Sequence, residues 1–133
     1  MGAWGPGPFS NDDALDWIAE FEESGVPLID RAFATAANEY LEAPDGSKII
    51  AAAEVVAAAL GYPSSEFPEV LRAPAMSARE TIMQSGDIRE SALRAVDRVV
   101  AKQSELDELW REPGADYETW LRSVRDLQKR LRK

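Results

Sequence analysis

The sequence predicts an all-α domain in which about six to seven helices surround a central Ala-rich helix. Apolar residues recur at helical spacing in one segment after another, and no run shows the period of two that strands require. A chain of 133 residues fits one domain, because domains most often hold about 100–150 residues. We therefore expect a single compact domain over residues 1–133.

The first helix is predicted over residues 12–24. Four apolar residues form one buried stripe, and they are Ala14, Trp17, Ile18 and Phe21. Ser10 and Asp13 have the spacing of a capping box, which predicts the start of this helix. Gly25 is a natural C-terminal stop, and Pro27 suits the first turn of a second helix over 27–43.

The central helix is predicted over residues 47–60, after a turn at 43–46 that contains Pro44 and Gly46. Residues 49–60 are apolar almost all round, which is typical of a buried helix. Glu54 interrupts this run, and burial would raise its pKa. We expect Glu54 to pair with a cation from a neighbouring helix, either Arg94 or Arg98, although work as a catalytic carboxyl stays open.

After the central helix, residues 62–76 are predicted to be irregular or to hold one short helix around 66–73, and four further helices follow. Ser77, Asp87 and Ser104 have capping-box spacing and predict three helix starts. The last helix is expected over 116–131, after a break at 113–114. The aromatic residues on the apolar faces are predicted to be core or interface residues, and they are Trp17, Trp110, Tyr117 and Trp120.

The charge is strongly negative and unevenly distributed. The chain has 24 acids and 15 bases, for a net charge of −9. Residues 1–47 hold ten acids against one base, residues 48–121 have a net charge of −5, and residues 122–133 have a net charge of +5. An acidic protein repels nucleic acid and anionic membranes, so we expect neither as a partner. The basic C-terminal segment is expected to be a solvated helix face, with contact to an acidic partner as the alternative.

The residue types that the chain lacks exclude several catalytic mechanisms and metal sites. With no His and no Cys, the sequence excludes Ser-His-Asp and Cys-His catalysis and the ordinary zinc sites. The segment 5–8 is not a phosphate loop, because two prolines remove backbone donors. We expect no cofactor. No secretory signal precedes the first helix, and the longest apolar stretch is too short to span a bilayer, so a cytoplasmic protein is expected.

The opening of the chain resembles that of an uncharacterised bacterial family, catalogued as a domain of unknown function. Its members begin Gly-x-Trp-Gly-x-Gly-x-Phe-x-Asn-Asp-x-Ala-x-Asp-Trp, and the matching residues here are Gly2, Trp4, Gly5, Gly7, Phe9, Asn11, Asp12, Ala14, Asp16 and Trp17. Segments 40–42, 52–57 and 104–110 are also similar to that family. The resemblance implies no activity.

The residue types of the same opening segment predict an arm that packs on the helices. Trp4 and Phe9 are large apolar anchors, and Gly5 and Gly7 let the backbone fold back closely. A functional pocket beneath this arm is the alternative.

Two functions follow from the acidic start of the first helix. Asp12, Asp16 and Glu20 share one helix face next to Asp13. They predict a non-enzymatic module, such as an immunity-like inhibitor or regulator, that binds a basic protein partner. The alternative is a Mg²⁺- or Mn²⁺-dependent hydrolase that uses Asp12, Asp13 and Asp16. A homodimer through exposed Trp or Leu stripes is compatible with either.

Overall fold

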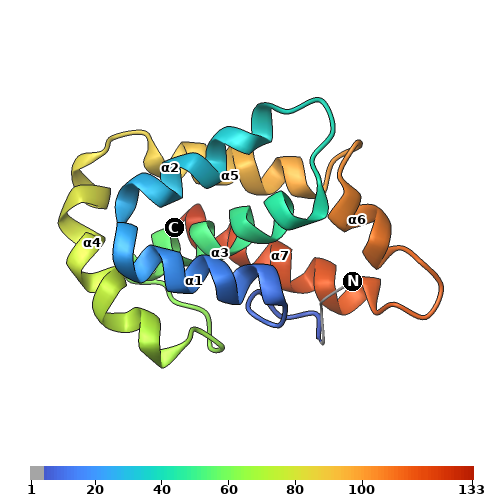
Figure 1. Ribbon diagram of the computed structural model, residues 1–133, viewed down its shortest axis with the longest axis horizontal. Helices are drawn as coiled ribbons and strands as arrows, with labels where there is room; N and C mark the ends of the chain where they lie inside the picture. The colour runs from blue at the N-terminus through green and yellow to red at the C-terminus, as the bar shows by residue number, and fades with distance from the viewer. Residues whose placement is uncertain (1–4) are drawn as a thin grey trace.

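The computed structural model describes residues 5–133 and shows an all-α fold over that range, as predicted (Figure 1). The described helices are α1 (Asp12–Ser24), α2 (Val26–Ala34), α3 (Ala43–Ala59), α4 (Arg72–Gln84), α5 (Ile88–Val99), α6 (Glu105–Trp110) and α7 (Tyr117–Leu131). Two 3₁₀ turns, η1 (Thr35–Ala37) and η2 (Glu69–Leu71), precede α3 and α4.

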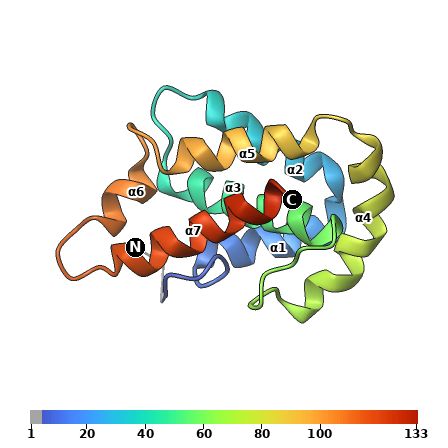
Figure 2. The same cartoon turned by 180° about the vertical axis from the view of Figure 1, so that it is seen from behind.

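Helix α3 is the centre of the bundle, as its composition predicts. It contacts every other α-helix, and most of its side chains are buried, including Glu54. Figures 1 and 2 view the molecule from opposite sides, with α1 in front of α3 in one and α7 in front of it in the other. Because α3 is rich in Ala, its neighbours approach it closely from several directions. Helices α1 and α7 therefore lie on opposite sides of the core.

The first helix has the predicted bounds but a different cap. Asn11 occupies the N-cap position, and its side-chain oxygen accepts a hydrogen bond from the Ala14 N–H at 2.8 Å. The predicted capping box of Ser10 and Asp13 is wrong, since it places the cap one residue too early.

The predicted second helix over 27–43 is wrong at its C-terminal end. Helix α2 stops at Ala34, and the predicted turn at 43–46 is the first turn of α3. Residues 38–42 are held in between by distant partners: the Leu41 N–H donates to the Gln103 carbonyl at 2.9 Å, and the Glu105 N–H donates to the Leu41 carbonyl at 2.9 Å. These bonds come from sequence-distant backbone and override the local helical pattern.

Helix α4 begins earlier than predicted. Ser77 lies in its middle rather than at its start, because the buried stripe of Ala75, Ala78 and Ile82 runs through it without a break. Asp87 and Ser104 do lie at the N-cap positions of α5 and α6, yet neither side chain makes a capping bond. The Ser104 hydroxyl donates instead to the Val99 carbonyl at the end of α5.

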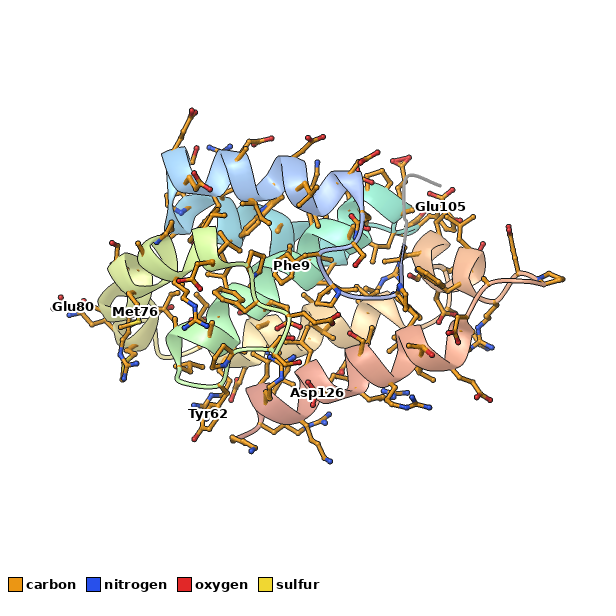
Figure 3. All side chains as sticks on the ribbon, turned by 90° about the horizontal axis from the view of Figure 1, so that it is seen from below. Phe9, Tyr62, Met76, Glu80, Glu105 and Asp126 are labelled. Carbon is orange, nitrogen blue, oxygen red and sulfur yellow. The ribbon has the colours of Figure 1, made fainter. Side chains whose placement is uncertain are left out.

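The described part of the N-terminal arm packs on the bundle, as predicted. Phe9, which is labelled in Figure 3, is buried. Its ring meets that of Phe67 edge to face, with the centroids 6.0 Å apart. A Cβ atom at Gly7 would lie 3.1 Å from a carboxylate oxygen of Glu66, so a larger residue here would require the Glu66 side chain to shift. Trp4, the other predicted anchor, lies outside the described residues.

Candidate interaction site

Helix α1 divides cleanly into a buried face and an acidic, exposed face. Ala14, Trp17, Ile18 and Phe21 face the core. The exposed carboxylates are those of Asp12, Asp16, Glu20, Glu22 and Glu23. Asp13 differs from them, since it is half-buried and turned towards the arm. We call these five exposed carboxylates, together with the Leu15 side chain between them, the acidic face of α1.

The carboxylates of this face form no ion pair in the described part of the chain, although Glu20 lines a pocket together with Arg31 and Lys48. Within residues 5–133, no ion pair or side-chain hydrogen bond involves an acid of α1, and the helix itself contains no base. Asp12 and Asp16, and Asp16 and Glu20, are like-charge pairs at i,i+4 spacing, which destabilise a helix. Glu22 and Glu23 lie in the last turn, where the helix dipole disfavours anions. Helix stability explains the acids of the first turn but not those that follow.

Leu15 adds an apolar contact point to the acidic face. Its side chain is 45% exposed, and helical spacing places it beside Asp12, Ala19 and Glu22. The sequence analysis did not single out Leu15, although its position off the buried stripe was the available signal of its exposure. An exposed apolar side chain with a polar rim is typical of the centre of a small protein interface.

The aspartates of the Asp-Asp-x-x-Asp motif do not converge. In the part of the chain that the structure describes, no three acidic side chains are placed so that they could share a metal ion. Asp13 lies on a different side of α1 from Asp12 and Asp16. The geometry that the predicted metal-dependent hydrolase needs is therefore missing among residues 5–133.

The cavity beneath the arm is small. It has a volume of about 30 Å³ and is lined by Gly5, Gly7 and Asn11 on one side and by Trp110 and Trp120 of the bundle. A single water needs about 10–15 Å³ of such space, so the cavity accommodates about two waters rather than a substrate. The arm is a packing element at this place, and its Gly residues provide the close cover.

Trp17 belongs to the opening motif but lies away from that cavity. Its ring stacks on Phe21 at 5.1 Å, and its indole N–H is buried without a hydrogen-bond partner among residues 5–133. A buried donor without a partner costs about 1–3 kcal/mol.

The other aromatic residues form a cluster where α6 meets α7. Trp110 and Trp120 stack at 6.2 Å, and both are buried, as predicted. The Tyr117 hydroxyl donates to Asp107 at 2.9 Å, and Arg111 binds the other oxygen of Asp107 at 2.8 Å. Burial, together with the bond to Asp107, raises the pKa of Tyr117. This cluster joins two helices and offers no open site.

Glu54 is buried, as predicted, but the predicted partners are wrong. It pairs with Arg130 of α7 instead of Arg94 or Arg98. Arg98 donates to four backbone carbonyls near the end of α5, whereas Arg94 is exposed. Burial raises the pKa of Glu54, and the contact with Arg130 lowers it by less. Its carboxyl is fully paired and is not available as an acid or base.

Fold and site together define an all-α domain that carries one acidic, uncompensated helix face. The chain belongs to the family described as Domain of unknown function (DUF4259), whose model matches residues 2–123. The resemblance to an uncharacterised family is thereby confirmed. No curated protein and no solved structure matches the chain. None of the helices over residues 5–133 has the length and apolar character that a membrane crossing requires.

Proposed function

We propose that the protein is a non-enzymatic interaction module that docks the acidic face of α1 onto a basic surface of another protein. The observation that carries this proposal is the accumulation of unpaired, exposed carboxylates at positions where they weaken their own helix. Such a cost is typical of residues retained for binding rather than for folding. An immunity-like inhibitor or a related regulator has this design.

The carboxylates and the Leu15 side chain have separate roles in this docking. The carboxylates steer a basic partner and raise the rate of association, which makes binding sensitive to salt. Leu15 supplies the apolar contact that slows dissociation once the surfaces have met. Buried apolar anchors inside a charged rim are the usual division of labour in an interface.

Affinity capture with matched charge reversals tests the proposal. We would immobilise the full chain, capture partners from an extract of its native host and compare two triple variants. Asp12→Lys/Asp16→Lys/Glu20→Lys reverses the acidic face of α1, whereas Glu39→Lys/Glu80→Lys/Glu112→Lys changes the net charge equally at exposed positions elsewhere. We expect the first variant to lose its specific partner and the second to retain it, with helical circular dichroism unchanged in both. Equal retention by both variants, or equal loss, would contradict the proposal.

A further inference from the structure

A second pocket lies beside α1, on the side that faces α2 and the start of α3. It has a volume of about 220 Å³. Its floor is apolar and is formed by the buried residues Trp17, Leu28 and Ala32. Pockets for drug-sized ligands hold about 300–1,000 Å³, so this pocket fits a smaller molecule.

The rim of this pocket gathers both of the first two cations of the chain. Arg31 is the only base among residues 1–47, and Lys48 is the next base along the sequence. Both line the pocket, from α2 and α3 respectively, and within residues 5–133 neither lies within ion-pair distance of an acid. In so acidic a segment, the convergence of these two cations on one pocket is not expected from composition.

Acceptors line the same rim. The carboxylates of Glu20 and Asp45 lie on this pocket. The Thr35 hydroxyl also lines it, and because this hydroxyl already donates to the Ala32 carbonyl at 2.7 Å, it offers a ligand only its lone pairs. The rim therefore presents positive groups for an anion and negative or neutral acceptors for a cation.

We propose that this pocket binds a free α-amino acid with an apolar side chain. Arg31 and Lys48 bind its carboxylate, and Glu20, Asp45 and Thr35 accept hydrogen bonds from its ammonium group. The apolar side chain packs on Trp17, Leu28 and Ala32. A purely anionic ligand would meet the two acids of the rim, and a purely cationic ligand would meet the two bases.

The Trp17 side chain offers a spectroscopic probe at the same place. Trp17 lines the pocket, and its nitrogen is the buried side-chain polar atom that has no partner in the described part of the chain. That nitrogen has almost no accessible surface, so a ligand in the pocket packs against the ring of Trp17 and does not bind its N–H. The indole resonance reports on this change in the surroundings of the ring.

The inference goes beyond the docking function and is tested without a protein partner. Arg31 and Lys48 are not part of the acidic face of α1, so variants at these positions leave that face intact. Glu20 belongs to both the acidic face of α1 and the rim of the pocket, so the variants that separate the two proposals are those at Arg31 and Lys48. Absence of amino-acid binding by the wild type would leave the docking proposal standing, and unchanged partner capture after charge reversal on α1 would leave the pocket proposal standing.

The experiment titrates the full chain with leucine, valine and alanine by calorimetry and by NMR of the indole N–H resonances. Two analogues of leucine serve as controls: leucinamide lacks the carboxylate, and 4-methylpentanoate lacks the ammonium group. We expect saturable binding of leucine with a shift of the Trp17 resonance, and binding of each analogue at least about tenfold weaker, the loss of one charge-assisted hydrogen bond.

Point variants locate the binding in the pocket. Arg31→Gln and Lys48→Gln are each expected to weaken leucine binding by about tenfold. Arg89→Gln, which changes an exposed cation on α5, is expected to leave it unchanged. Absence of saturable binding for all three amino acids, equal binding of leucine and its analogues, or full binding by both pocket variants would each overturn the proposal.

Discussion

Arg130 and Glu54 form a two-point contact inside the bundle. The Nη1 atom of Arg130 lies 2.8 Å from Oε1 of Glu54, and Nη2 lies 3.0 Å from Oε2. The two side chains are 11% and 1% exposed. The same guanidinium binds Asp126 through Nε at 2.8 Å and donates to the Tyr62 carbonyl at 3.1 Å. One side chain of α7 thus joins α3 to the segment that follows it.

Loss of Arg130 is expected to be strongly destabilising. Arg130→Met leaves the Glu54 carboxylate buried without a counter-charge, which lowers the free energy of unfolding by about 3–5 kcal/mol. The control Lys129→Met changes the exposed neighbouring cation and is expected to stay within about 0.5 kcal/mol of the wild type. Urea denaturation measures both changes.

A double variant tests whether the stability lost in Arg130→Met comes from the unpaired Glu54 carboxylate. Because replacing a buried pair by apolar residues is often neutral, Glu54→Leu/Arg130→Met is expected to recover most of the stability lost in Arg130→Met. If the double variant were less stable than the single variant, the buried carboxylate would not be the source of the loss.

Stability is expected to depend on pH through Glu54. Burial is the main cause that raises its pKa above the ordinary value of 4.5, and the nearby acids Asp126 and Glu66 add to it. The native state therefore holds the proton more tightly than the unfolded chain does. This contribution to stability is fully present below pH 4.5 and is lost as the pH rises through the higher native pKa.

The measurement compares wild type with Glu54→Gln in urea denaturation across this range. The wild type is expected to lose stability relative to Glu54→Gln as the pH rises above about 4.5, since glutamine does not titrate. A difference that stays constant with pH, or that changes in the opposite direction, would show that the native pKa of Glu54 is not raised.

The sequence predicted what depends on local periodicity and missed what depends on distant partners. The burial of α3 was predictable because its sequence is an almost continuous apolar run. The exposure of Asp12, Asp16 and Glu20 was predictable because helical spacing places all three on the face opposite the buried stripe. The partner of Glu54 was not predictable in this way. Periodicity shows that the residue is buried, but Arg130 is 76 residues away, and the neighbour it meets depends on how α3 and α7 pack.

The candidate site also has one part that local periodicity predicts and one part that depends on distant partners. Leu15 was open to prediction because it lies off the buried stripe of α1. The pocket at Trp17 was not, because its rim combines Glu20 of α1, Arg31 of α2 and Lys48 of α3. Only the packing of three helices brings these charges to one place.

Arg98 is expected to stabilise the connection between α2 and α3. Its guanidinium donates to the carbonyls of Asn38, Glu39, Lys102 and Gln103 at 2.9–3.2 Å. Because hydrogen bonds from a charged group to exposed carbonyls contribute modestly, Arg98→Ala is expected to lower the free energy of unfolding by about 1–3 kcal/mol. Arg98→Lys keeps the charge but not the fork of donors, so it is expected to recover only part of this loss.

Arg94→Ala is the matched control on the same helix. Its contacts with Ser91 at 3.5 Å and Glu90 at 3.9 Å are long and exposed, so the change is expected to stay within about 0.5 kcal/mol. Hydrogen exchange at the Leu41 amide, which bonds to the Gln103 carbonyl, is expected to accelerate in Arg98→Ala alone. Equal effects of the two alanine variants would rule out the carbonyl contacts as the cause.

Glu105 is expected to cap the central helix from a distance. Its side-chain oxygen accepts a hydrogen bond from the Ala43 N–H at 2.8 Å, across 62 residues of sequence, and so satisfies a free donor in the first turn of α3. Glu105→Ala is expected to lower the free energy of unfolding by about 0.5–2 kcal/mol and to accelerate hydrogen exchange at the Ala43 amide. Glu105→Gln keeps an acceptor oxygen and loses only the attraction of the charge to the helix dipole, so its loss of stability should be smaller.

Glu112→Ala, which changes an exposed acid just after α6, serves as the control for charge. If the Ala43 amide were equally protected in Glu105→Ala and Glu112→Ala, the hydrogen bond to Glu105 would not be what holds the start of α3. Its own backbone and Leu41 would then hold it.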